Sequence, residues 1–109
     1  MVKDFMDNST GPQSEAAKQD DPGKIRWDQT TEEKFKQMIG KIPVFLRGIA
    51  QAKVSQKAES IVRKENRREV FEKDMVDAFF SETPFGFHGP MKSDMASAGI
   101  DYTKYGHPP

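Results

Sequence analysis

Cysteine is absent from the 109 residues of this chain, and its absence excludes several classes of site. Without thiols there are no disulfides, no thiolate nucleophile, no iron–sulfur ligation and no cysteine-bound zinc. A reducing compartment is consistent with this composition, although a secreted protein can also lack cysteine. The sequence therefore points away from thiol chemistry.

Long apolar runs are also missing. No stretch approaches the roughly 18 apolar residues that a membrane-spanning helix needs. The first residues include Asp4 and Asp7, where a signal peptide would require a continuous apolar segment. We therefore expect a cytoplasmic protein that does not bind a membrane.

The chain has no excess of charge of either sign. It carries 17 acidic and 17 basic side chains, so its formal net charge is zero. Bulk charge thus gives no argument for nucleic acid or an anionic membrane as the partner. Hydrophobic residues make up only 35% of the chain and charged residues 31%, which allows only a small core. Small domains often take part of their stability from a partner or an oligomer.

Residues 1–26 are polar and are interrupted by Gly11, Pro12, Pro22 and Gly23. A segment of this composition buries too little apolar surface to offset the entropy lost on ordering. We expect a disordered polar arm ahead of the folded part.

Residues 27–82 predict a small three-helix domain, so the expected fold class is all-α. The three helices span about 30–41, 44–65 and 71–82. Thr30 or Thr31 can cap the first helix, and Pro43 suits the first position of the second. Apolar residues recur at helical spacing in all three, beginning with Phe35, Met38, Ile39 and Ile42.

Residues 83–109 have a different composition. Four glycines and four prolines lie between residues 84 and 109, so we expect an extended, irregular tail. The tail carries four aromatic residues, Phe85, Phe87, Tyr102 and Tyr105. A segment with this mix does not form its own core, but it can lie along the surface of a partner. We expect these four aromatic residues to bind that partner.

One pattern in the central segment resembles a known family. It begins at Trp27, continues through an Ile-Pro-x-Phe-x-Arg run at residues 42–47, and includes Val54, Ala58, Val70, Met75 and Ala78. This pattern resembles the small C-terminal helical module of the light-independent protochlorophyllide reductase B subunit, which also occurs in short stand-alone proteins. The resemblance covers about half of the chain, roughly residues 27–80.

The chain departs from that family pattern at three places. Ser55 stands where the family has Glu, the glycine of the second turn is missing, and Phe71 replaces the Thr that opens the last helix. In the reductase, the chemistry belongs to large preceding domains with cysteine-bound clusters, and this chain has none of them. The resemblance therefore implies an accessory subunit of a larger redox or tetrapyrrole-related enzyme, with no catalytic residue and no cofactor of its own.

Trp27 and the residues Pro43 to Phe45 are the anchors of this resemblance, and Arg47 follows two residues later. We expect Trp27 to pack over the first turn and Phe45 to fill the junction between helices. A direct contact of Trp27 with a partner or a tetrapyrrole is the alternative. Because a cation is unfavourable in the first turn of a helix, Arg47 needs a group that holds it. The sequence leaves open whether that group is a carboxylate within the domain or one on a partner.

Basic side chains gather between residues 53 and 68. This basic strip consists of Lys53, Lys57, Arg63, Lys64, Arg67 and Arg68. Such a strip can sit on phosphates, so nucleic-acid binding is an alternative function. No recognition motif or stacking aromatic accompanies the strip, and a solvated helix face is therefore the favoured interpretation.

The two histidines, His88 and His107, lie in the glycine-rich tail. Without a carboxylate partner they make a poor metal site, so we expect no bound metal. No nucleophile beside a base, paired carboxylates or phosphate-binding glycine loop is identifiable either. The sequence thus predicts a non-catalytic interaction subunit that docks on a larger protein, with direct tetrapyrrole binding as a further alternative.

Overall fold

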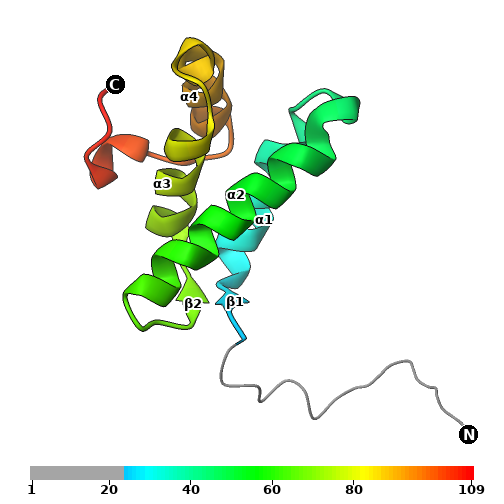
Figure 1. Cartoon of the computed structure of the whole chain (residues 1–109). Helices are drawn as coiled ribbons and strands as arrows, with labels where there is room; N and C mark the ends of the chain where they lie inside the picture. Colours follow the sequence, from blue (N-terminus) through cyan, green and yellow to red (C-terminus); the bar gives the residue numbers. More distant parts are fainter. Residues whose placement is uncertain (1–23) are drawn as a thin grey trace, which may run out of the picture.

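The computed structural model describes residues 24–109 and confirms the all-α fold class (Figure 1). The described part contains four α-helices: α1 (Gln29–Gly40), α2 (Val44–Lys64), α3 (Glu72–Glu82) and α4 (His88–Ser97). Two short strands and two 3-10 turns complete it: β1 (Arg26–Trp27), β2 (Glu69–Val70), η2 (Phe85–Phe87) and η3 (Tyr102–Tyr105). The polar arm predicted for residues 1–26 falls mostly outside the described residues, and its last residue belongs to β1.

Helix α1 begins at a cap that differs from the predicted one. The side chain of Asp28, rather than Thr30 or Thr31, accepts a hydrogen bond of 3.0 Å from the backbone nitrogen of Thr31. An aspartate cap satisfies one of the free N–H groups at a helix start and complements the positive end of its dipole. The helix buries Thr31, Phe35, Met38 and Ile39 against the rest of the domain.

Helix α2 begins at Val44 and is the longest helix of the described part, and Pro43 stands at its N-cap rather than at the predicted first helical position. It ends in a Schellman motif, in which the backbone nitrogens of Asn66 and Arg67 bond back to the carbonyls of Arg63 and Val62. Asn66 takes the left-handed conformation at φ 60° that this motif needs.

The segment between α2 and α3 contains the short strand β2. Trp27 pairs with Val70 and Arg26 with Glu69 in a parallel two-stranded ladder, β1–β2. The backbone nitrogens of Arg26 and Asp28 donate to the carbonyls of Arg68 and Val70 at 2.8 and 3.0 Å. This ladder fixes Trp27 beside the helices.

The prediction of an irregular tail at residues 83–109 is wrong. Helix α4 forms there because its proline and glycines lie at the helix ends. Pro90 occupies the first turn, where a missing N–H costs nothing, and Gly99 adopts the left-handed conformation just after the helix at φ 76°. Met91, Met95 and Ile100 are buried in the core, so this segment completes the domain.

The core forms where α1 and α3 pack on the C-terminal half of α2, and α4 adds Met91 and Met95 to the same cluster. Only Val54, Ala58 and Val62 of α2 are buried, so the first part of this helix projects beyond its neighbours. Figure 1 shows α2 and α3 diverging from the end that carries the strands. The start of α2 and the α3–α4 connection therefore lie at the opposite end of the molecule. None of the helices between residues 24 and 109 has the length and hydropathy to span a bilayer.

Candidate partner-binding surface

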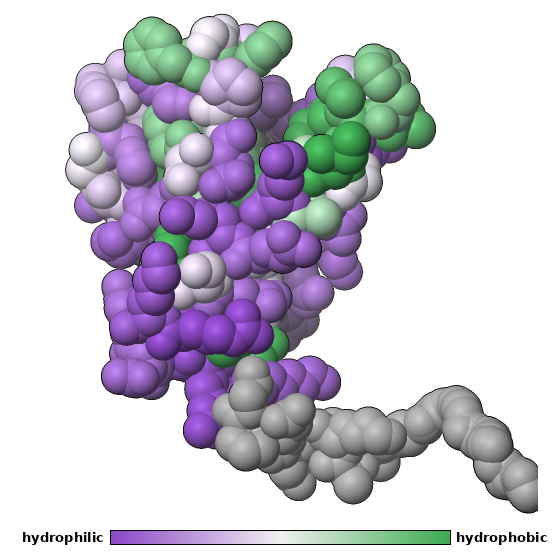
Figure 2. Space-filling model, in the orientation of Figure 1, coloured by the Kyte–Doolittle hydropathy of each residue, from purple (hydrophilic) through white to green (hydrophobic). Residues whose placement is uncertain are grey.

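Four large apolar side chains are exposed at the start of α2. Val44, Phe45, Leu46 and Ile49 are between 44% and 82% exposed, and Phe45 is the most exposed of the four. We call these four residues the α2 tip; Figure 2 shows apolar colour at this projecting end. The prediction that Phe45 fills a junction between helices is therefore wrong, because no other helix extends far enough to cover it.

A second exposed apolar group lies in η2, between α3 and α4. Phe85 is 87% exposed and Phe87 is 64% exposed. Figure 2 shows apolar surface at both projections of the same end of the molecule, with a notch between them. Phe85 and Phe87 are thus accessible, as a role in partner binding requires.

Tyr102 and Tyr105, also predicted to bind a partner, are used inside the domain. The hydroxyl of Tyr105 donates to a Glu72 carboxylate oxygen at 2.8 Å, and the ring of Tyr102 lies 5.7 Å from that of Phe80. Burial, together with the hydrogen bond to Glu72, raises the pKa of Tyr105 to about 12. Both tyrosines are half-buried and attach the C-terminal residues to α3.

Within the described residues Arg47 binds two backbone carbonyls and no carboxylate of the domain. Its Nε donates to the carbonyl of Ile42 at 2.8 Å, and an Nη donates to the carbonyl of Gly40 at 2.7 Å. These carbonyls stand at the end of α1 and in the following turn, where a cation complements the negative end of the helix dipole. Arg47 therefore fixes the α1–α2 turn and, with it, the position of the α2 tip.

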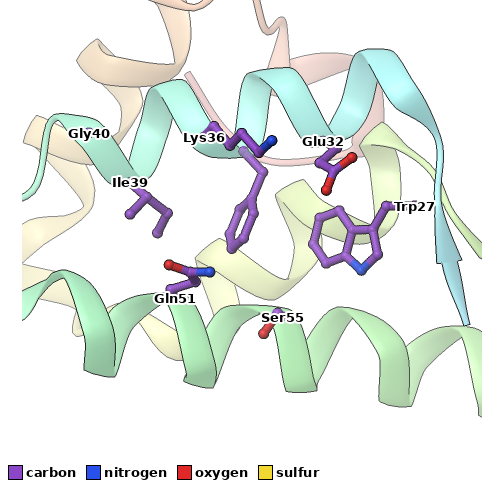
Figure 3. A pocket seen from close by; sticks show the side chains of 8 residues that line it. Trp27, Glu32, Lys36, Ile39, Gly40, Gln51 and Ser55 are labelled. Carbon is purple, nitrogen blue, oxygen red and sulfur yellow. The ribbon is translucent and has the colours of Figure 1, made fainter. Parts of the chain in front are cut away.

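Trp27 forms one wall of a groove between α1 and α2 (Figure 3). The groove has a volume of about 320 Å³. Phe35 and Ile39 form its apolar floor beside the Trp27 wall. Its rim is polar, with side chains from both helices: Glu32, Lys36, Gln51 and Ser55. This volume is near the lower limit of ligand pockets and suits one large side chain.

The indole of Trp27 is held firmly in this wall. Its Nε1 donates to a carboxylate oxygen of Glu59 at 3.0 Å, and its ring lies 4.8 Å from that of Phe35. Phe35 in turn contacts Phe79 of the core at 5.8 Å. The groove floor is thus rigid and continuous with the core.

Two of the six residues of the predicted basic strip, Arg63 and Arg67, pair with carboxylates of the domain. Arg67 binds the buried Asp74 with two nitrogens, at 2.6 and 3.2 Å, and also pairs with Glu65 at 2.8 Å. Arg63 lies 4.0 Å from Glu59. Lys53, Lys57, Lys64 and Arg68 make no ion pair within the described residues, and all but the half-buried Lys57 are exposed.

The two histidines are engaged within the domain. His107 stacks on Phe80 with ring centroids 4.0 Å apart and lies 2.7 Å from a carboxylate oxygen of Asp77, so it does have a carboxylate partner. His88 contacts the carbonyl of Thr83 at 2.9 Å. Among residues 24–109, no three potential ligands from His, Asp and Glu converge on a metal site.

Comparison of the chain with protein-family models, curated proteins and solved structures gave no match. The resemblance to the reductase module therefore depends on the quoted residues alone and stays a prediction. Val44, Leu46 and Ile49 were not predicted as surface residues. The available signal was the cluster of apolar residues at the start of α2, which extends beyond the part of the helix that the neighbouring helices cover.

Proposed function

We propose that this chain is a non-catalytic interaction module that docks on a larger protein through its exposed apolar end. One observation carries the proposal: the α2 tip, with Phe85 and Phe87, places six large apolar side chains on the surface at the same end of the molecule. Single exposed apolar residues are common on proteins, whereas a group of them at one end is typical of interaction sites.

The energetics of these side chains favour a partner. Full burial of a Leu, Ile or Phe side chain contributes about 1.5–3 kcal/mol, and aromatic residues often dominate interface energies. Phe45 and Phe85, the two most exposed residues of this group, would release the most apolar surface from water. A small core limits what the domain gains from its own folding, so the interface adds stability that the isolated chain lacks.

The partner we propose is a redox or tetrapyrrole-related enzyme, and this part of the proposal is supported by the resemblance of Trp27 and the 42–47 run. The test is a pull-down of the tagged chain from its native host, with the captured proteins identified by mass spectrometry. A stoichiometric large enzyme with that chemistry supports the proposal.

Matched variants make the pull-down specific for the α2 tip. The double substitution F45S/I49S should abolish capture of that enzyme, because it removes two exposed apolar side chains of the α2 tip, at 82% and 61% exposure. The control Gln56→Ser changes an exposed residue further along α2 and should leave capture intact. Equal capture by the wild type and F45S/I49S would refute docking through this surface.

A second candidate is nucleic-acid binding, favoured by Lys53, Lys57 and Lys64, which share the solvent-facing side of α2. Phosphate contacts release counterions, so affinity for duplex or single strands should fall steeply with salt. Binding that is absent, or insensitive to salt, would remove this candidate. Direct tetrapyrrole binding would instead shift the absorption band of the added pigment.

A further inference from the structure

We infer that the α1–α2 hairpin takes an acidic segment of its protein partner, which inserts one large apolar side chain into the Trp27 groove. This inference rests on the proposed function and names the chemistry of the partner. It is carried by two independent features of the hairpin, its charge and its groove.

The charge of the hairpin is of one sign over a long stretch. Between Glu33 and Glu59 the sequence has no acidic residue, yet it has six basic ones: Lys34, Lys36, Lys41, Arg47, Lys53 and Lys57. The chain as a whole is neutral, so this imbalance is local. Around the α2 tip a partner therefore meets only cations, whereas Glu32 stands at the far end of the groove, on its rim. Complementary charge at the tip favours Asp and Glu on the partner.

Half of these cations are exposed and available to a partner. Lys34 pairs with Glu72 at 2.6 Å, and Arg47 binds the two backbone carbonyls of the turn. Lys36, Lys41 and Lys53 are exposed and make no ion pair within the part of the chain that the structure describes. They lie on α1, in the turn and on α2.

The groove is continuous with the α2 tip. Val44, Gly48, Gln51 and Ser55 follow one another at i, i+4, i+7 and i+11, which places them on one side of α2. Gln51 and Ser55 line the groove, so the same side leads from the groove to Val44. Gly48 and Gly40 have nothing within 4 Å of the position of a Cβ, which leaves room for a close approach. An amphipathic helix laid in a groove is a common mode of such recognition.

A protein segment fits this surface better than an anionic bilayer. A concave groove with a polar rim offers hydrogen-bonding groups to a side chain, whereas lipid headgroups form a flat layer. The second apolar group also argues against lipid, because residues 78–91 around Phe85 and Phe87 contain no Lys or Arg and do contain the exposed Glu82. An anionic surface would be repelled there.

The test selects binders from a phage-displayed library of random peptides with the whole chain as bait. Enriched peptides should combine Asp and Glu with a large apolar residue. Because Trp27 is the single tryptophan of the chain, the best peptide should also change its fluorescence on titration. The K41E/K53E variant should bind that peptide about tenfold more weakly and should select peptides with fewer acids. The matched variant K64E/R68E makes the same change in charge at the other end of α2 and should behave as the wild type.

The outcomes separate this inference from the proposed function. The enriched peptides could show no excess of Asp and Glu and yet fail to bind the F45S/I49S variant. That result would support docking through the apolar surface and refute an acidic partner. An acidic peptide that leaves Trp27 fluorescence unchanged would overturn the role of the groove. Failure to enrich any peptide, or binding of the chain to vesicles of anionic lipid that F45S/I49S abolishes, would overturn both proposals.

Discussion

Tyr105 donates a hydrogen bond of 2.8 Å to Glu72, which lies 33 residues earlier in the chain. Glu72 also accepts a bond of 2.6 Å from Lys34, on α1. The first residue of α3 thus connects α1 to the C-terminal residues, which the sequence alone had placed on a partner. This relationship makes the stability of the domain depend on pH at both ends of the scale.

At high pH, ionisation of Tyr105 should destabilise the fold. The pKa of Tyr105 is raised from 10.0 to about 12, so its contribution is fully present below pH 10 and is lost as the pH rises through 12. The full shift would correspond to nearly 3 kcal/mol, and partial exposure reduces our expectation to about 1 kcal/mol. Urea unfolding at a series of alkaline pH values measures the loss. The Tyr105→Phe variant should be less stable at neutral pH and should lack this loss.

At low pH, protonation of Glu72 should weaken the same connection. Burial raises the pKa of Glu72, but the hydrogen bonds from Lys34 and Tyr105 outweigh burial and hold the pKa below its ordinary value of 4.5. Its contribution is therefore present above pH 4.5 and is lost as the pH falls through the lowered pKa. The Glu72→Gln variant should show a smaller loss of unfolding free energy between pH 6 and acid than the wild type. An identical acid profile for both proteins would contradict this assignment.

The buried carboxylate of Asp74 should be the most sensitive polar group in the described part. It accepts two bonds from Arg67 and one of 2.9 Å from the backbone nitrogen of Phe71, and it is only 3% exposed. Asp74→Ala leaves Arg67 and that N–H group without their acceptor, so we expect a loss of about 3 kcal/mol in unfolding free energy. Urea denaturation measures it. The exposed Glu33→Ala serves as control, and a comparable loss for the control would contradict the role of Asp74.

Local signals in the sequence predicted the middle of the fold well. Pro43 and the apolar spacing of Val54, Ala58 and Val62 placed α2 within a residue of its observed end. The β1–β2 ladder was not predictable, because two-residue strands leave no periodicity and their pairing joins segments far apart in the chain. The ladder matters to the candidate site because it fixes the position of Trp27.

The C-terminal helix was missed for a different reason. The glycines and prolines of this segment were interpreted as helix breakers. In α4 they stand at the ends of the helix, with Pro90 in its first turn and Gly99 just after its last turn. The i, i+4 spacing of Met91 and Met95 was the available signal. The candidate surface was likewise only half predictable, because exposure of Phe45 depends on where the neighbouring helices stop.

Two residues of the C-terminal segment should respond in opposite ways to substitution. Met95 is fully buried, so Met95→Ala should lower the unfolding free energy by about 2–4 kcal/mol through the cavity it leaves. Phe85 is 87% exposed, so Phe85→Ser should change stability by less than about 0.5 kcal/mol. Urea unfolding of the two variants compares them directly.

The same contrast affects how the tail is tested for binding. Deletion of residues 84–109 would remove Met91, Met95 and Ile100 from the core, so lost binding after deletion would reflect unfolding. Phe85→Ser and Phe87→Ser leave the core intact and test the surface alone. A stability loss for Phe85→Ser as large as that for Met95→Ala would contradict the exposed position of η2.

Arg47 should act on the α2 tip without touching a partner. Its guanidinium holds the carbonyls of Gly40 and Ile42, and Arg47→Ala should cost about 1 kcal/mol, as expected for partly exposed hydrogen bonds. Hydrogen exchange should then accelerate at the amides of Lys41 and Ile42, which bond to the carbonyls of Met38 and Ile39 at 3.1 and 3.0 Å.

Lysine offers one ammonium in place of the planar fork, so Arg47→Lys should restore only part of the protection. Arg63→Ala, which removes a cation from the other end of α2, should leave these two amides unchanged; faster exchange there in both alanine variants would show that Arg47 does not fix the turn.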